Sequence, residues 1–249
     1  MRNSKNPSES SLMEITELKN LIQQENLSGI AAFLEQPRSK KMQQILFART
    51  GEFLALQGRS KHNIEYLYWA RQYGLQCLKL DANFANVIQA HHGEVSKQAI
   101  EALNEQDLST LQCAQWLLVG WSLWLDYRGS VGVGNDIVAV QSLGEWLIRS
   151  DSLRLSLDES VLDIPWIWYG YALSQSLGES YYTVDWSKVQ KGFENAGVLD
   201  DLMRFEYQYH YVRFVNVSEY CDYSELGDIP LPIQERWDNS QYLCTTDAK

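Results

Sequence analysis

Apolar residues recur at intervals of three and four along most of the chain, which is the spacing of one face of an α-helix. Glycine and proline, such as Pro37, Gly58, Gly93 and Gly178, fall between these segments. A capping box, Ser11-x-x-Glu14, marks the start of the first helix. The pattern predicts an all-α chain with helices over about 12–26, a short stretch ending before Pro37, 39–57, 60–80, 82–92, 94–104, 107–127, 136–155, 164–177, 185–195 and 198–219.

The short connections between these segments favour antiparallel neighbours, so we expect stacked helical hairpins, a degenerate tetratricopeptide-like repeat array. The predicted organisation is N-terminal helices over 1–37, a helical-repeat domain over 38–226 and an irregular tail over 227–249. One segment conflicts with this scheme. Residues 204–214, "RFEYQYHYVRF", alternate polar and aromatic side chains with the period of a strand, but no second run of that type could pair with it.

The segment 113–129, "CAQWLLVGWSLWLDYRG", is the most aromatic part of the chain. Its apolar run from Trp116 to Leu125 has ten residues, whereas a membrane-spanning helix needs roughly 20. On a helical wheel with Trp116 at zero, Tyr127 lies at about 20°, Trp124 at about 80° and Trp121 at about 140°. The four rings therefore share one side of a predicted helix, and membrane insertion is not expected.

Small and slim residues lie among these rings, with Gly120 at about 40°, Cys113 at about 60° and Leu117 at about 100°. The notch at Gly120 is open to two interpretations: a neighbouring helix fills it, or the rings wall a ligand cavity. Gln115, Ser122 and Asp126 cluster on the opposite face, which predicts a solvated strip there.

Composition narrows the function classes. The net charge is −11, from 21 basic and 32 acidic residues. This negative charge disfavours binding to nucleic acid and to anionic lipid, because their phosphates would be repelled. The first residues show no apolar secretory segment, so we expect a cytoplasmic protein. The four cysteines at 77, 113, 221 and 244 are widely spaced and show no CxxC pair, so we expect reduced cysteines and neither a disulfide framework nor a zinc site.

Three stretches resemble the T-component proteins (TatT) of TRAP transporters, an all-helical family related to tetratricopeptide repeats. They are "YWARQYGLQCLKLD", with Arg71, Tyr73 and Gly74 in place, "QWLLVGWSLWLDYRG", with the step from Trp116 to Trp121, and residues 143–160, "LGEWLIRSDSLRLSLDES". Order and spacing agree over roughly residues 45–178. Members of the family usually carry a lipoprotein start, which we do not expect from the first residues here, and the final portion resembles a shortened form of the family's later helices.

The resemblance implies a non-catalytic helical-repeat protein that associates with a protein partner and holds a small apolar or organic-acid ligand in an internal hollow. It implies no catalytic residue, and we expect no cofactor and no metal. Homo-oligomers are compatible with such a scaffold. Candidate ligand-binding residues are the aromatic and polar groups of the matched stretches and of "PWIWYGYALS", namely Arg71, Tyr73, Trp116, Trp121, Trp124 and Tyr169. For Arg71, a carboxylate such as Asp126 is the expected partner.

The alternative is an enzyme, or an accessory subunit of a biosynthetic enzyme, on the same scaffold. Glu206, His210 and Arg213 share one face of a predicted helix and could bind a carboxylate or transfer a proton, although an exposed ion-pair ladder is the favoured interpretation. His91 and His92 point about 100° apart on a helix and cannot share one metal without other ligands. The glycine-rich "RGSVGVGND", residues 128–136, is interpreted as a connection ending in a cap at Asn135 or Asp136 rather than a phosphate loop.

Overall fold

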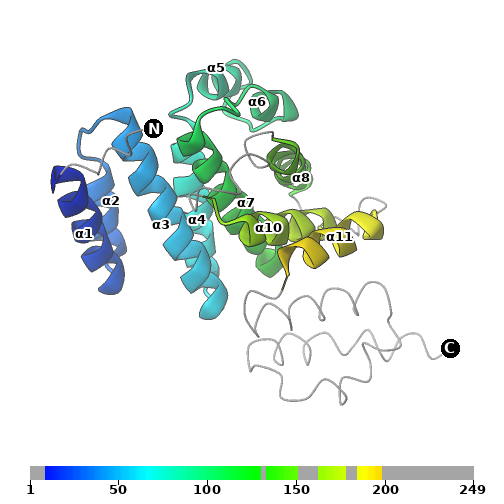
Figure 1. Cartoon of the computed structure of the whole chain (residues 1–249), viewed down its shortest axis with the longest axis horizontal. Coiled ribbons are helices and arrows are strands. Elements are labelled where there is room, and N and C mark those ends of the chain that lie inside the picture. The colour runs from blue at the N-terminus through cyan, green and yellow to red at the C-terminus, as the bar shows by residue number, and fades with distance from the viewer. Residues whose placement is uncertain (1–8, 130–132, 151–161, 178–183, 198–249) are drawn as a thin grey trace, which may run out of the picture.

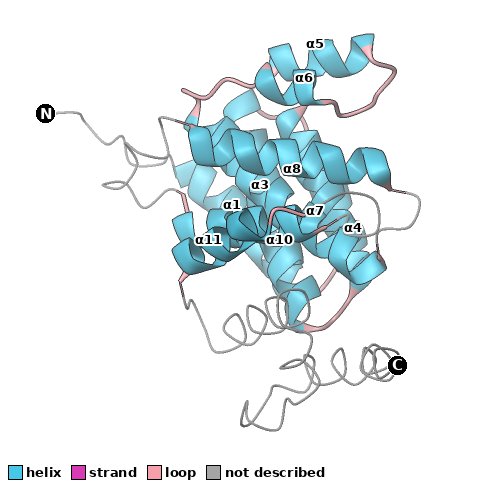
Figure 2. Ribbon diagram, turned by 90° about the vertical axis from the view of Figure 1, so that its right-hand side faces the viewer, coloured by secondary structure: helices cyan, strands magenta, loops and turns pink. Residues whose placement is uncertain are grey.

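A computed structural model describes residues 9–129, 133–150, 162–177 and 184–197, and these residues confirm the all-α class (Figures 1 and 2). The helices are α1 (Glu9–Gln23), α2 (Leu27–Leu34), α3 (Lys40–Ser60), α4 (Ile64–Leu78), α5 (Ala82–Ala90), α6 (Lys97–Glu101), α7 (Leu108–Arg128), α8 (Gly134–Arg149), α10 (Ile164–Ser176) and α11 (Trp186–Ala196). The predicted helix over 198–219, the strand-like pattern at 204–214 and the tail over 227–249 lie outside the described residues.

Most of these helices begin at a side chain that satisfies the free backbone amides of the first turn. The oxygen of Asn63, for example, accepts hydrogen bonds from the amides of Glu65 and Tyr66 at 2.9 and 3.2 Å. The capping residues with such bonds are Asn26, Ser39, Asn63, Asp81, Ser96, Asp107 and Asp185. Local sequence therefore sets most helix starts before any tertiary packing is considered.

Helix α7 is the centre of the fold, because it packs against α3, α4, α8 and α10. The hairpin of α3 and α4 lies on one side of it, and α10, which also contacts α8 and α11, lies on the other. Figure 1 shows α1 to α4 side by side, with α10 and α11 crossing their direction and α5 and α6 at one end. This arrangement is a stack of helical hairpins.

The predicted N-terminal region attaches to that stack through charged contacts as well as apolar packing. Helices α1 and α2 both contact α3. Arg38 Nε donates to Glu14 Oε2 at 2.8 Å, and the Tyr66 hydroxyl donates to Glu25 Oε2 at 2.9 Å. Glu25 also pairs with Lys61, and these hydrogen bonds lower the pKa of the Glu25 carboxyl.

Helices α4 and α7 run antiparallel at unusually close range because small residues line their contact. A Cβ atom at Gly120 would lie 2.9 Å from the Cβ of Ala70, and one at Gly74 would lie 2.8 Å from the Cα of Leu117. The notch at Gly120 is thus filled by α4. The stripe of Cys113, Leu117 and Gly120 identified on the helical wheel is the face that α4 covers.

This close approach predicts opposite effects for two glycine-to-alanine substitutions. Gly74→Ala would force a backbone shift at Leu117, so we expect a loss of about 1–3 kcal/mol in the free energy of unfolding. At Gly51, in α3, the nearest atom to an added Cβ is 3.6 Å away. Gly51→Ala should therefore raise stability by up to about 1 kcal/mol, since alanine favours the helix.

Urea unfolding of the two variants and the parent protein measures both effects. Equal stabilities for Gly74→Ala and Gly51→Ala would show that α4 and α7 do not meet as described.

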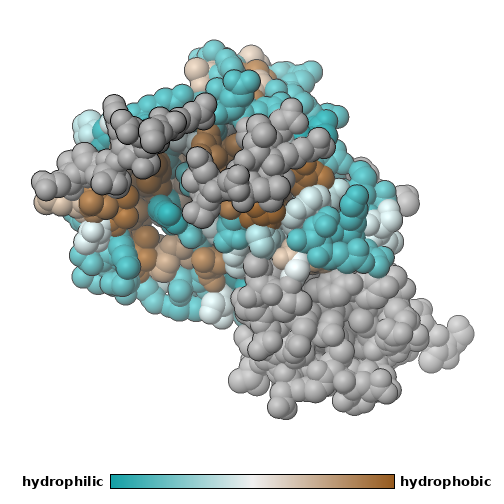
Figure 3. All heavy atoms as spheres, in the orientation of Figure 1, coloured by the Kyte–Doolittle hydropathy of each residue, from teal (hydrophilic) through white to brown (hydrophobic). Residues whose placement is uncertain are grey.

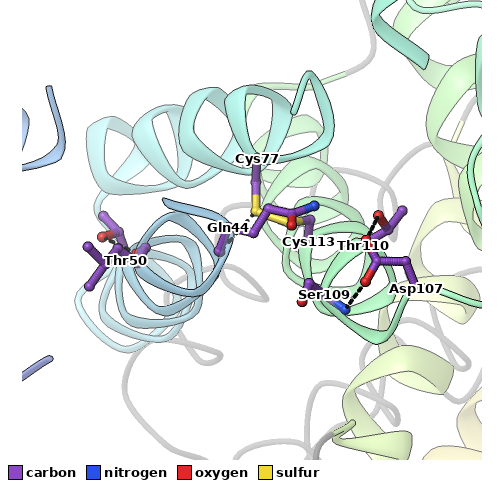
Figure 4. Close-up of a disulfide and its surroundings, with 8 residues drawn as sticks. Gln44, Thr50, Cys77, Asp107, Ser109, Thr110 and Cys113 are labelled. Carbon is purple, nitrogen blue, oxygen red and sulfur yellow. Dashed lines mark hydrogen bonds between the residues drawn. A yellow bond between two sulfur atoms is a disulfide. The ribbon is translucent and has the colours of Figure 1, made fainter. Parts of the chain in front are cut away.

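Two of the four cysteines contradict the expectation of reduced thiols, and the other two, Cys221 and Cys244, lie outside the described residues. Cys77 of α4 and Cys113 of α7 form a disulfide across the helix contact, with Cα atoms 5.5 Å apart, and both side chains are buried (Figure 4). The Cys77 Sγ lies 3.2 Å from the carbonyl oxygen of Gln44 in α3. The sequence could not reveal this pair, because its two halves are 36 residues apart and meet only once the helices pack.

The predicted solvated strip on α7 is also wrong in two of its three positions. Gln115 is 1% exposed and Ser122 is fully buried. The Ser122 hydroxyl donates to the carbonyl oxygen of Gly170 at 3.2 Å, so α10 covers this side of α7 and satisfies the polar group. Asp126 is intermediate in exposure.

Several predicted helix boundaries shift. Helix α1 begins at Glu9, so Ser11 is not its N-cap. Helix α8 begins at Gly134, with Val133 as its N-cap residue, so Asp136 lies in the first turn rather than at the cap. Helix α5 ends at Ala90, and His92 takes a positive φ of 54°, so the two histidines are not on one regular helix.

Some apolar side chains remain at the surface. Ile64, Tyr68 and Trp69 of α4 are 44%, 39% and 36% exposed, and Met13 of α1 is 73% exposed. Figure 3 shows brown, hydrophobic surface where Figure 1 places α1 and α2. Within the described residues, no helix combines the length and apolarity that crossing a membrane would require.

Candidate functional site

Arg71 is the centre of the most distinctive polar cluster in the described structure. Its guanidinium carbon lies 4.8 Å from the ring centroid of Trp121 and 5.0 Å from that of Trp124. A second guanidinium, that of Arg128, lies 5.0 Å from the Trp124 ring. Contacts of this kind attract a cation to the face of an indole, and together they hold the Arg71 side chain in one place.

The helix contact explains why Arg71 reaches these rings. Ala70 occupies the notch at Gly120, and a Cβ at Gly120 would lie 3.4 Å from the backbone nitrogen of Arg71. Arg71 therefore starts beside the narrowest part of the α4–α7 contact. Its side chain extends along α7 over the two indoles, so three of the six predicted ligand-binding residues come together here.

The partner of Arg71 is Asp136 of α8, not the predicted Asp126. Arg71 Nη2 donates to Asp136 Oδ1 at 2.8 Å, with side-chain exposures of 17% and 28%. The sequence indicated Asp136 only as a helix cap. Its position in the first turn of α8 instead points its carboxylate across the helix junction to α4.

The Arg71 groove lies beside this ion pair and has a volume of about 720 Å³. It is lined by Arg71 of α4, by the chain leading into α6 and by the first turns of α8: Glu94, Val95, Ser96, Lys97, Val133, Gly134, Asn135, Asp136, Val138 and Ala139. Two cations and two carboxylates line this groove. The first amides of α8 have no partner within the helix, and they favour negative charge.

Two buried donors in this cluster have no hydrogen-bond partner within the described part of the chain. They are Nε of Arg71 and Nε1 of Trp121. Buried donors of this kind are usually satisfied by an ordered water or another acceptor. At the junction of α4, α7 and α8, the described residues therefore leave two buried donors without an acceptor.

A second hollow, the Trp116 cleft, has a volume of about 540 Å³ and lies between α3, α7 and the start of α10. Trp116, 6% exposed, forms part of its wall. The other lining residues are Ile45, Ala48, Arg49, Glu52, Gln112, Gln115, Leu162, Asp163, Ile164 and Pro165. Trp116 is one of the predicted ligand-binding residues, whereas the polar lining residues come from three separate segments of the chain.

The remaining two candidates lie in the core. Tyr73 is 6% exposed and packs between the rings of Phe47 and Trp69, with centroids 6.1 and 5.9 Å away, and burial raises the pKa of its hydroxyl. Tyr169 is fully buried, 5.4 Å from the Trp166 ring. The guanidinium of Arg59 lies 5.5 Å from the Tyr169 centroid.

Of the residues considered for an enzyme, only the two histidines lie in the described structure. His91 and His92 are exposed at the end of α5, while Glu206, His210 and Arg213 lie outside the described residues. Over residues 9–129, 133–150, 162–177 and 184–197, no three histidine, cysteine or acidic side chains are grouped so as to hold a metal ion.

Comparisons with known proteins add no relative. No family model, no curated protein and no solved structure matches this chain.

Proposed function

We propose that this chain is a non-catalytic helical-repeat binding protein of the T-component type, and that the Arg71 groove holds a small organic acid. The observation that carries this proposal is the Arg71 guanidinium, which two indoles hold in place at the edge of a groove of about 720 Å³. That volume lies in the range of small-molecule sites.

The ligand's carboxylate would meet Arg71 and the first turn of α8. A guanidinium binds carboxylates through paired hydrogen bonds, and a helix start adds backbone donors. Asp136 already accepts from Arg71 Nη2, so a ligand must share or replace that contact. Asp136 thus acts as an internal counterion that keeps Arg71 neutralised when no ligand is bound.

Fluorine NMR of the fluorotryptophan-labelled protein tests this proposal, with signals assigned by single Trp→Phe substitutions. Benzoate is expected to shift the Trp121 and Trp124 signals in a saturable way, because it binds the guanidinium that contacts both rings. Benzyl alcohol has nearly the same shape without the charge and serves as the control. Equal shifts with both compounds, or no shift at these two signals, would refute an acid site at Arg71.

The resemblance to T-component proteins also supports association with a protein partner.

The Cys77–Cys113 disulfide favours an oxidising compartment over the predicted cytoplasm, since disulfides persist where thiols are not kept reduced.

A further inference from the structure

The Trp116 cleft differs in charge from the Arg71 groove. Its charged lining groups are Arg49 and Glu52 of α3 and Asp163 before α10, which is one cation against two carboxylates. Arg49 Nη1 lies 2.7 Å from Glu52 Oε2, and the Arg49 side chain is 58% exposed. The one cation is therefore already paired and lies at the rim.

Asp163 is the other carboxylate of the cleft, and Arg49 pairs with Glu52 rather than with it. It stands exposed at the cap position of α10, without the side-chain capping bonds that Asp81 and Asp107 make at the starts of α5 and α7, and the Trp166 backbone amide is the one group that interacts with its carboxyl among the neighbours described. Its backbone amide donates to Oε1 of Gln115 at 3.1 Å. Gln115 is 1% exposed, so a rigid residue of α7 fixes the position of Asp163 at the cleft.

The rest of the wall combines the uncharged amides of Gln112 and Gln115 with apolar and aromatic residues. Trp116 contributes an indole, and Ile45, Leu162 and Pro165 contribute aliphatic surface. Indole faces attract cations, and ligands bound in apolar clefts are oriented by a few polar groups. A ligand with a positive charge and an apolar body matches both properties.

We propose that the Trp116 cleft is a second binding site, which takes a small organic cation with its ammonium group beside Asp163 and its apolar body against Trp116. This site is separate from the Arg71 groove and does not depend on the function proposed for that groove. An anion would instead meet two carboxylates and only the paired guanidinium of Arg49.

Binding in this cleft should depend on pH through Asp163. Partial desolvation by the surrounding protein raises the pKa of the Asp163 carboxyl. The hydrogen bond from the Trp166 backbone amide lowers this pKa, but its effect is smaller. Protonation removes the negative charge, so cation affinity should fall as pH decreases through this raised pKa. The groups facing Asp163 from α3 are Arg49 and Glu52, and α7 presents the uncharged amides of Gln112 and Gln115.

The test uses the full chain labelled with fluorotryptophan, and the probe is benzylammonium. Benzylammonium is expected to shift the Trp116 signal, and calorimetry should give an affinity about tenfold higher than that of benzyl alcohol. Asp163→Asn should reduce benzylammonium affinity to the level of the alcohol. Arg71→Met is the matched control, since it alters the other site and should leave benzylammonium binding unchanged.

The pH profile of the parent protein gives a readout that does not rely on any variant folding. Benzylammonium affinity should decline on acidification while benzyl alcohol affinity stays constant. The proposal is overturned if the alcohol binds as tightly as the amine, if Asp163→Asn folds and keeps full affinity, or if the two pH profiles are the same.

Discussion

Replacing Cys77 and Cys113 together with alanine is expected to lower the free energy of unfolding by about 4 kcal/mol. The disulfide closes a loop across 36 residues and joins α4 to the central helix α7. Without it, the unfolded chain gains conformational entropy, and the small-residue contact between these helices loses its covalent tie. Alanine is the appropriate replacement because both sites are buried, and serine would add an unsatisfied hydroxyl.

Denaturant unfolding of the double variant measures this loss, and alkylation shows whether the bond exists. In a chain with Cys221→Ala and Cys244→Ala, the unfolded protein should take up iodoacetamide at Cys77 and Cys113 only after reduction. Alkylation of both residues before reduction would contradict the disulfide.

Arg71→Met is expected to weaken benzoate binding by about 10- to 100-fold and to lower stability by about 2 kcal/mol. Methionine keeps an extended apolar side chain between the two indoles but removes the charge. Benzoate then loses the Arg71 guanidinium that binds its carboxylate, and Asp136 of α8 loses its ion-pair partner in α4.

Arg71→Lys separates charge from geometry in this prediction. Lysine keeps the positive charge but lacks the planar fork that binds carboxylates and stacks on indoles. We expect benzoate affinity between those of the parent protein and Arg71→Met, measured by calorimetry. Full affinity in Arg71→Met would show that benzoate does not bind Arg71.

Helical periodicity predicted the architecture well because each helix carries its own apolar face and, in most cases, its own cap. The wheel for α7 even grouped Cys113, Leu117 and Gly120 on one side, and this stripe is the one that α4 covers. The wheel could not show that the opposite side is covered too. Gln115 and Ser122 are polar but buried, because the start of α10 and the Gly170 carbonyl satisfy them.

The candidate site was predictable only in part. The aromatic segment 113–129 and the stretch "YWARQYGLQCLKLD" indicated Arg71, Trp121 and Trp124, and the structure brings these three together. The partner Asp136 was missed, because its role depends on where α8 begins and on the tertiary packing that brings this first turn to Arg71. The Trp116 cleft likewise forms only through tertiary packing, because its charged residues come from α3 and from the segment before α10.

The affinity of Asp136→Asn for benzoate is the most direct test of the central claim, that Arg71 is a ligand-binding cation with Asp136 as its internal counterion. Asparagine keeps the size of the side chain but removes the competing charge. Calorimetry should therefore show benzoate binding to this variant about three- to tenfold more tightly than to the parent protein. If Arg71 and Asp136 instead form a purely structural pair, the affinity would stay the same or fall, and that result would contradict the proposed site.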